Sequence, residues 1–140
     1  MENDEIVDIK ESQIRYFGGP GKMLLPTPAT VAAQIRQIPA GRLLTTDLLR
    51  KGLAEQFGVQ GTCPVTTKKA LTAIASDPSQ DVPWWRVIKQ NGELMANYPG
   101  GVAGHASRLA EEGFTITESQ KPKVNKFRQS LVHFNQEEQP

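Results

Sequence analysis

The chain has 140 residues, of which 38% are hydrophobic, and a formal net charge of +1. This length suits one domain with a sizeable core, and no segment approaches the roughly 18 apolar residues that span a bilayer. A single cysteine, Cys63, excludes an internal disulfide and fits a reducing compartment. The acidic first residues lack the apolar run of a secretion signal, so we expect a cytoplasmic protein with no membrane partner.

The charge is unevenly distributed along the chain. Acidic side chains gather in the first eleven residues, whereas residues 36–108 hold nine Lys or Arg against five Asp or Glu. A basic surface is what binding to the phosphates of nucleic acid requires. Ordinary solvated helix faces produce such a balance more often, so charge alone leaves both interpretations open.

The first quarter of the chain contains one predicted helix. Residues 1–22 are expected to form an acidic tail and lead-in, ending in the glycine-rich loop 18–21. The helix begins after Thr27, a suitable N-cap, and has Pro28 at its first position. Apolar residues then recur at helical spacing, and the segment 39–41 ends the helix.

Two further helices form a recognisable pair. One begins at Thr46 and ends at Gly58, and the next is capped by Thr66 or Thr67 and runs to about Ser76. Three polar residues occupy the exposed first turn of this third helix: Thr67, Lys68 and Lys69. A helix, a glycine-containing turn and a helix with a basic start make the helix-turn-helix pattern, in which the second helix enters a DNA groove.

The second half of the chain is expected to contain a hairpin and a last core helix. An extended segment over 82–89 is followed by an Asn-Gly turn and a return strand over 93–96. The helix runs from about residue 102 to 112, and a short strand follows at 114–117. The pattern therefore predicts a mainly α-helical fold with a small β-hairpin, a winged-helix-like helix-turn-helix domain.

Three parts of the chain are predicted. Residues 1–22 form the acidic tail and lead-in, residues 23–117 the DNA-binding domain, and residues 118–140 a polar, partly helical C-terminal tail. Lysine and arginine side chains of this last part are candidates for further phosphate contacts: Lys121, Lys123, Lys126 and Arg128.

The order of three short motifs along the chain is informative. Ile38-Pro39-Ala40-Gly41-Arg42 precedes the helix-turn-helix, Pro83-Trp84-Trp85-Arg86-Val87 follows it, and Asn97-Tyr98-Pro99-Gly100-Gly101 follows the hairpin. Over about residues 28–114 this order resembles the C-terminal domain of the O6-alkylguanine-DNA alkyltransferases, also called methylated-DNA–protein-cysteine methyltransferases. It resembles even more the alkyltransferase-like proteins of that family, in which tryptophan replaces the reactive cysteine. The three motifs together are specific, whereas any one alone is weak.

The resemblance implies that alkyl-transfer chemistry is missing. The alkyltransferases use a Pro-Cys-His-Arg-Val segment, whose thiolate attacks the alkyl carbon. Trp84 stands at the position of the cysteine, Trp85 at that of the histidine, and Glu112 at that of the glutamate that orients the histidine. An indole neither accepts an alkyl group nor shuttles a proton at neutral pH. We therefore expect no enzyme activity at this position, and no cofactor or metal.

The resemblance also implies a binding function. Proteins of this type hold an O6-alkylguanine base in a pocket without repairing it, and flag it for other repair machinery. The implied lesion pocket comprises Trp84, Arg86, Tyr98, Pro99 and Gly100. The implied DNA contacts are Thr46, Thr67, Lys68 and Lys69, with structural support from Glu112 and Trp85. The implied partners are double-stranded DNA, alkylated or not, and nucleotide-excision repair proteins, with a monomer as the default state.

Two positions depart from the family pattern. Thr46 stands where the family has a tyrosine that rotates the target phosphate, and Lys68 stands where an arginine fills the gap left by the flipped base. Lysine stacks on bases less well than arginine. An alternative interpretation is therefore a DNA-binding regulator that kept the scaffold without base flipping.

Other functions stay open from the sequence. Cys63 precedes the third helix, where a helix N-terminus favours a reactive thiolate, so a third possibility is an enzyme that uses Cys63 as nucleophile. A lone intracellular cysteine is more often a small buried residue. A fourth possibility is a protein–protein adaptor with an exposed tryptophan patch. His105 and His133 are expected at the surface, and one cysteine with two distant histidines does not make a zinc site.

Overall fold

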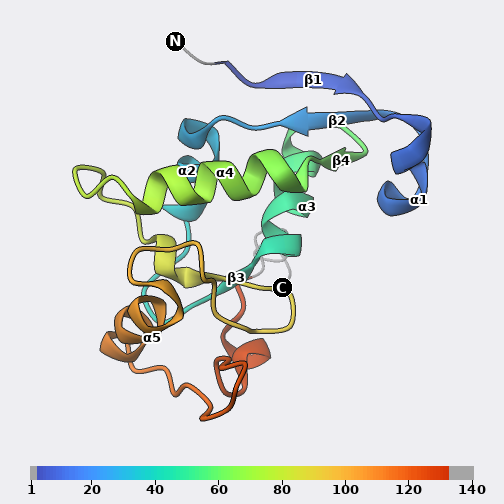
Figure 1. Ribbon diagram of the computed structural model, residues 1–140. Coiled ribbons are helices and arrows are strands. Elements are labelled where there is room, and N and C mark those ends of the chain that lie inside the picture. Colours follow the sequence, from blue (N-terminus) through green and yellow to red (C-terminus); the bar gives the residue numbers. More distant parts are fainter. Residues whose placement is uncertain (1–2, 133–140) are drawn as a thin grey trace, which may run out of the picture.

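The computed structural model describes residues 3–132, and Figure 1 shows the arrangement of its elements. The predicted fold class is confirmed: helices dominate, and a few short strands accompany them. Within the described residues, none of the helices has the length and apolarity needed to cross a bilayer. His133 lies outside the described residues, so its predicted surface position is not addressed.

The N-terminal segment forms a pair of strands, although the sequence predicts a tail for residues 1–22. Its elements are β1 (Glu5–Asp8), the 3-10 helix η1 (Glu11–Gln13), α1 (Ile14–Phe17) and β2 (Lys22–Leu25). β1 lies antiparallel to β2, with Glu5 opposite Leu25. The Asp4 carboxylate also accepts hydrogen bonds from the Thr27 N–H and the Thr30 hydroxyl. These contacts with distant residues fix a segment that is too polar to be predicted as structured.

The first helices begin and end close to the predicted residues. In α2 (Pro28–Ile35), Thr27 is the N-cap, and its hydroxyl accepts from the Thr30 N–H at 3.3 Å. Helix α3 (Thr46–Phe57) ends at Gly58, whose φ of 66° is the left-handed conformation that glycine adopts without strain.

A short strand and an earlier helix start follow α3. Strand β4 (Gly61–Thr62) leads into α4 (Pro64–Ala75), whose N-cap is Cys63. The helix begins two residues before the predicted cap at Thr66, because proline at the first position is already set for helical geometry.

Two small sheets connect these elements. β2 lies parallel to β4, which gives a three-stranded sheet in the order β1-β2-β4. In Figure 1 this sheet runs along the upper edge of the molecule, with α4 beneath it and α5 (Gly101–Glu111) at the opposite end. β3 (Leu44–Thr45) lies parallel to β5 (Val87–Ile88).

The predicted hairpin is only partly present. The segment predicted as an extended strand begins with a 3-10 helix, η2 (Trp84–Arg86), and then enters β5. The Asn-Gly turn does form, because the Lys89 N–H donates to the Glu93 carbonyl at 3.0 Å. The return segment 93–96 then turns away, and the Leu94 N–H donates to the Pro122 carbonyl. Strand β5 pairs instead with β3, where both strands are fully buried.

The apolar side chains form two clusters. The larger cluster includes residues of α2, α3 and α4 and is joined at its edge by Trp84. The smaller one contains Leu109 of α5, Ile88 of β5, and Val124 and Phe127 of the C-terminal segment. Phe127 begins the 3-10 helix η3 (Phe127–Ser130), so part of the predicted tail is folded onto the domain. The predicted strand over 114–117 is reduced to one bridge between Ile116 and Val124.

Candidate nucleic-acid interface

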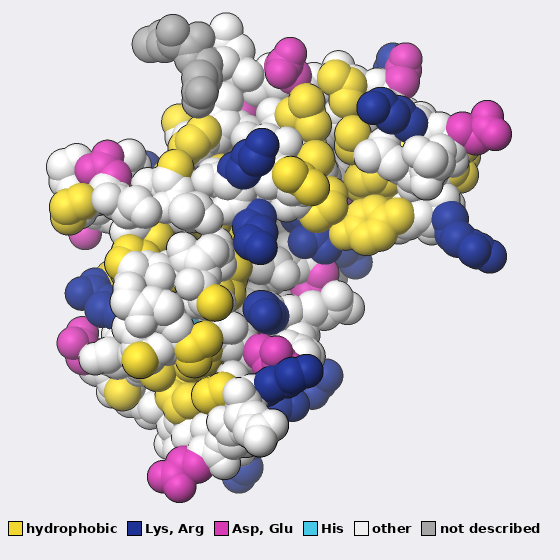
Figure 2. Space-filling model, viewed as in Figure 1, with side chains coloured by type: hydrophobic (Ala, Val, Ile, Leu, Met, Phe, Trp, Pro, Cys, Tyr) yellow, Lys and Arg dark blue, Asp and Glu magenta, His cyan; other side chains and the backbone are white. Residues whose placement is uncertain are grey.

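One face of α4 is open to solvent. Its members recur at helical spacing and form what we term the outer face of α4: Val65, Lys68, Lys69, Thr72, Ala73 and Ser76. The two lysines are the only long side chains among them, and small residues fill the second half. Figure 2 shows basic side chains over this helix and in a column that continues below it. A helix with this face can approach a phosphate backbone closely.

A cavity of about 300 Å³ opens beside the start of α4. Three cationic residues line it, namely Arg50 of α3, Lys68 of α4 and Lys89, and none of its described lining residues is acidic. Thr46 and Asn97 add polar groups to the same wall. The volume lies at the lower end of the range for small-ligand pockets. We call this the basic cavity; it suits an anionic ligand with a flat, apolar part.

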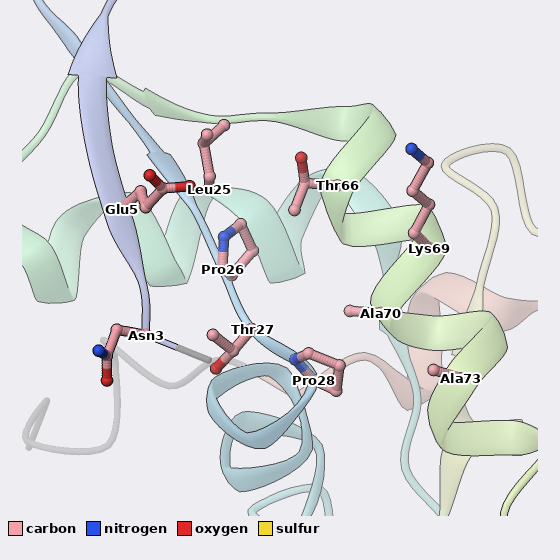
Figure 3. A pocket seen from close by; sticks show the side chains of 10 residues that line it. All are labelled: Asn3, Glu5, Leu25, Pro26, Thr27, Pro28, Thr66, Lys69, Ala70 and Ala73. Atoms are coloured by element: carbon pink, nitrogen blue, oxygen red, sulfur yellow. The ribbon is translucent and has the colours of Figure 1, made fainter. Parts of the chain in front are cut away.

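The two adjacent lysines of α4 line different cavities. Lys69 lines a separate cavity of about 680 Å³ between α4 and the N-terminal strands. Figure 3 shows Lys69 and Thr66 on α4, with Glu5 of β1 and Leu25 of β2 along the strand side. Because an acidic and a basic residue share this lining, it lacks the single-sign character of the basic cavity. Of the two lysines, Lys68 is the one that belongs to the basic cavity.

Thr67 is buried and also lines the basic cavity, so its predicted DNA contact stays a prediction. Its side chain is buried, and its hydroxyl donates to the Cys63 carbonyl at 2.8 Å. Thr67 lies three residues before Ala70 and four before Leu71, both of which are buried. It therefore belongs to the inner face of α4. Thr46 is half-buried and lines the same cavity.

Trp84 lies between the core and the surface. Its ring is partly buried against the larger apolar cluster and contacts the Tyr98 ring at a centroid distance of 4.7 Å. Trp85 meets it edge-on at 5.5 Å, and the Arg108 guanidinium lies 3.9 Å from the Trp85 ring centre. Trp84 is not among the residues that line the basic cavity. It forms part of an aromatic cluster next to that cavity's Met95–Asn97 wall.

The five residues of the predicted lesion pocket do not converge on the basic cavity. Tyr98 is buried, its hydroxyl donates to the Val87 carbonyl at 3.4 Å, and burial raises its pKa. Pro99 and Gly100 are exposed in the loop before α5. The Arg86 guanidinium donates to Glu112 and to the Ile38 carbonyl. The residues just before this loop, Met95, Ala96 and Asn97, line the basic cavity, and the predicted lesion pocket stays a prediction.

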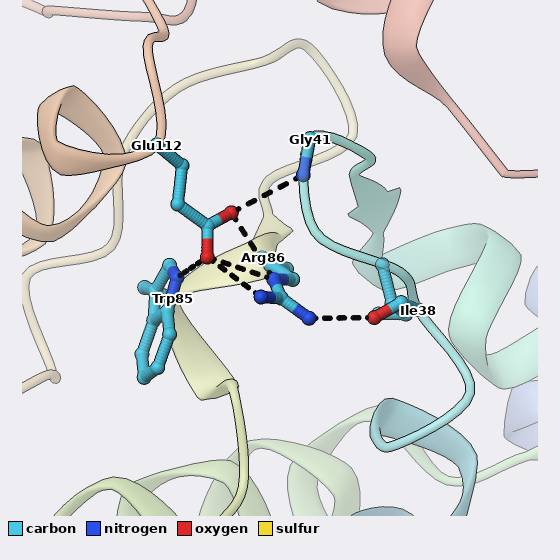
Figure 4. A network of polar contacts seen from close by, with 5 residues as sticks. All are labelled: Ile38, Gly41, Trp85, Arg86 and Glu112. Carbon is cyan, nitrogen blue, oxygen red and sulfur yellow. Dashed lines mark hydrogen bonds and ion pairs between the residues drawn. The ribbon is translucent and has the colours of Figure 1, made fainter.

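Arg86 and Glu112 form a compact polar network, drawn in Figure 4. The two side chains are 14% and 15% exposed, and their shortest contact joins Nη2 of Arg86 to Oε2 of Glu112 at 2.7 Å. Arg86 Nη1 also donates to the Ile38 carbonyl at 2.7 Å, and the Trp85 indole N–H donates to Glu112 at 2.9 Å. Burial alone would raise the pKa of Glu112, but the bonds from Arg86 and Trp85 lower it overall. The network joins η2, the end of α5 and the 38–41 segment.

Residues 26–114 match the family model of the 6-O-methylguanine DNA methyltransferase DNA-binding domain. This chain belongs to that family. Two solved structures have a similar fold: S. pombe Atl1 in complex with damaged DNA containing O6-carboxymethylguanine, and S. pombe ATL in complex with DNA. They are 24% and 22% identical, each with a TM-score of 0.57, covering 76% of this chain and 94% of theirs. No curated protein matches the chain. The predicted relationship to the O6-alkylguanine-DNA alkyltransferases is thereby confirmed.

Two indoles occupy the positions that the resemblance assigns to the family's reacting groups. The resemblance assigns the cysteine and histidine positions to Trp84 and Trp85, and both indoles are held in the aromatic cluster. The Glu112 carboxylate, assigned to orienting the family's histidine, receives the Trp85 indole N–H and the Arg86 guanidinium. An indole nitrogen keeps its proton, so this arrangement holds the loop and moves no proton.

His105 is a buried residue that the sequence places at the surface. It is 0% exposed; its Nδ1 accepts from the Met95 N–H at 3.0 Å, and its Nε2 lies 2.8 Å from the Trp85 carbonyl. Both bonds are satisfied by a neutral imidazole with its proton on Nε2, and burial lowers the pKa to about 4. Its spacing from Val102 and Leu109 on α5 is the signal that places it inward. His105 thus ties the η2 loop to the Met95 wall of the basic cavity.

Cys63 has a structural position in the described chain. It is partly buried at the start of α4, and its sulfur accepts from the Thr66 hydroxyl at 3.4 Å. Among the described residues, His, Cys, Asp and Glu do not gather into a group of three or more that could hold a metal ion.

Proposed function

We propose that this chain binds double-stranded DNA through the outer face of α4 and the basic cavity, and recognises O6-alkylguanine there without repairing it. Membership of the methyltransferase DNA-binding family supports the DNA partner. The similar fold of S. pombe Atl1, whose structure contains an O6-carboxymethylguanine lesion, supports the class of damage. The proposed outcome of binding is a flag for nucleotide-excision repair proteins.

The observation that carries the proposal is the pair of indoles at positions 84 and 85. Transfer of an alkyl group needs a thiolate and a group that takes its proton, and neither is available from Trp84 or Trp85. Neither indole lines the basic cavity, so in this proposal the indoles support its wall, because His105 joins the Trp85 carbonyl to the Met95 N–H. Tyr98 and Trp85 hold Trp84 at two ring contacts, so the indole is fixed before a ligand arrives.

The basic cavity supports the capture of a nucleotide. Lys68 and Lys89 can neutralise phosphates, which supplies most of the sequence-independent affinity for DNA. Thr46 lacks the tyrosine ring of the family, but Arg50 lies one helical turn further along α3 in the same wall. A cation at this point takes over the attraction of the target phosphate in the proposal. Leu71 and Met95 give the cavity an apolar part for the base.

Matched duplexes test the proposal directly. We expect tryptophan fluorescence to be quenched, and affinity to be higher, with a duplex carrying one O6-methylguanine than with the same duplex carrying guanine. The mass of the intact protein should be unchanged after incubation with the damaged duplex. Lys68→Gln should weaken binding to both duplexes, whereas Lys51→Gln is the matched control, because Lys51 lies outside the basic cavity.

Each alternative has its own outcome. Equal affinity for the two duplexes would favour the regulator without base flipping, for which the small Thr46 is the supporting feature. A gain in protein mass that disappears in Cys63→Ala would favour the enzyme that uses Cys63 as nucleophile. Negligible binding even at low salt, where counterion release favours association most, would favour the adaptor. The proposed monomer and the proposed cytoplasmic location are tested separately, by sedimentation with and without DNA and by imaging of a tagged chain.

A further inference from the structure

A second basic hollow adjoins the basic cavity. It has a volume of about 440 Å³ and four polar lining residues: Lys89, Gln90, Asn91 and Arg128. Lys89 lines both hollows, so their surfaces are continuous. Three of these residues follow β5, but Arg128 comes from η3, beyond the residues 26–114 that match the family. The hollow is therefore built jointly by the family domain and this chain's own C-terminal segment.

The two parts of the hollow are locked together at Gly92. This glycine has φ of 89°, and a Cβ added to it would lie 2.4 Å from the Phe127 ring. The ring thus occupies the space that any other residue would fill, and Phe127 is 6% exposed. The Val124 N–H also donates to the Gly92 carbonyl at 3.0 Å. These contacts place η3 against the turn that carries Lys89.

The contact described for the Arg128 side chain is with an aromatic ring, which does not neutralise its charge. Its guanidinium lies 4.6 Å from the Phe127 ring centre, a cation–π contact that leaves the N–H donors available. The nearest acidic residue along the turn is Glu93, and its carboxylate accepts the Asn91 amide at 2.8 Å. Lys89 and Arg128 are both exposed. Among the described residues, no acid lines this hollow, and two cations side by side make a site for a phosphate group.

We propose that Lys89 and Arg128 hold a backbone phosphate of the DNA strand that flanks the proposed lesion site. The inference rests on the proposed DNA binding and extends its footprint to the C-terminal segment. The column of basic side chains below α4 in Figure 2 is the path that the strand would follow. Contacts of this kind add affinity and register, but no preference for a damaged base.

Salt-dependent binding tests this site in the full chain. The logarithm of the DNA association constant falls with the logarithm of the salt concentration, and each lost phosphate contact makes this dependence shallower by about 0.9. The same loss weakens binding about eightfold at 0.1 M salt. We expect a loss of about this size for Lys89→Gln and for Arg128→Gln, and the same loss for damaged and undamaged duplexes. Lys51→Gln is again the matched control, since it removes an exposed charge that lines neither hollow. Arg128→Lys should keep most of the salt slope.

The outcomes separate this inference from the proposed function. If Arg128→Gln changes affinity and slope no more than Lys51→Gln, with both variants as thermally stable as the wild type, the phosphate site is refuted. If the wild type binds both duplexes equally and Arg128→Gln still loses one phosphate contact, only the lesion preference fails. If the wild type binds neither duplex at low salt, both proposals fail.

Discussion

Gly104 of α5 provides a test in which the usual rule for helices should be reversed. Alanine in place of glycine inside a helix normally stabilises a protein by about 0.5–1 kcal/mol. Here an added Cβ would lie 2.2 Å from the Pro99 carbonyl oxygen and 3.2 Å from its carbon. Gly100 approaches from the same side, since its own Cβ would be 3.0 Å from the Gly104 Cα. The obstacle is backbone, so the loop must move or α5 must shift.

The expected effect follows from these two opposing contributions. Overpacking of this kind costs about 1–3 kcal/mol, which exceeds the helix-propensity gain, so Gly104→Ala should lower the free energy of unfolding by about 1–2 kcal/mol. Urea unfolding measures this loss, and the melting temperature should fall by about 3–8 °C. Ala103→Gly is the matched control; this exposed neighbour should lose about 1 kcal/mol through propensity alone. A stabilised Gly104→Ala variant would refute the close packing of the 99–100 loop on α5.

Three further substitutions test the polar and packed contacts near the site. Glu112→Gln leaves the Arg86 guanidinium without its ion pair, so urea unfolding should show a loss of about 2–4 kcal/mol; Glu111→Gln, on an exposed neighbour, should change stability by less than about 0.5 kcal/mol. The pKa of His105 is lowered to about 4, so the unfolded chain binds a proton below about pH 6.5 that the folded chain does not. Stability should therefore fall by roughly 2 kcal/mol from pH 7 to pH 5, and a His105→Gln variant with the same pH dependence would contradict this. Gly92→Ala should lower the free energy of unfolding by about 1–3 kcal/mol, because the methyl group meets the Phe127 ring and the φ of 89° strains any other residue. A variant whose melting temperature by calorimetry equals that of the wild type would show that η3 does not pack there.

Local signals were enough to predict most helices. Thr27 with Pro28 marks the start of α2, and Gly58 marks the end of α3, because capping depends on a few neighbouring residues. The strands were less predictable. β5 could pair with the segment after its own turn or with β3, and the choice depends on burial against distant residues. The N-terminal strand β1 also depends on contacts with distant residues, since it is held by β2 and by the hydrogen bonds of Asp4.

The family was predicted from the sequence, whereas the roles of the predicted site residues stay predictions. The motif order was sufficient to predict the family, because three short patterns with fixed spacing rarely occur together by chance. The inward positions of Thr67 and His105 were readable from helical periodicity, yet a polar side chain in an early turn favours an exposed interpretation. The roles of Lys89 and Arg128 were not readable together, because they meet only through the packing of Phe127 on Gly92.

The bond from the Trp85 indole to Glu112 has a consequence for any attempt to install alkyl transfer by substitution. A cysteine introduced at position 84 alone would gain no proton acceptor from Trp85, because the indole N–H can only donate. A histidine introduced at position 85 alone would have no thiol beside it at position 84. The cysteine–histidine pair that alkyl transfer uses would therefore need both replacements together.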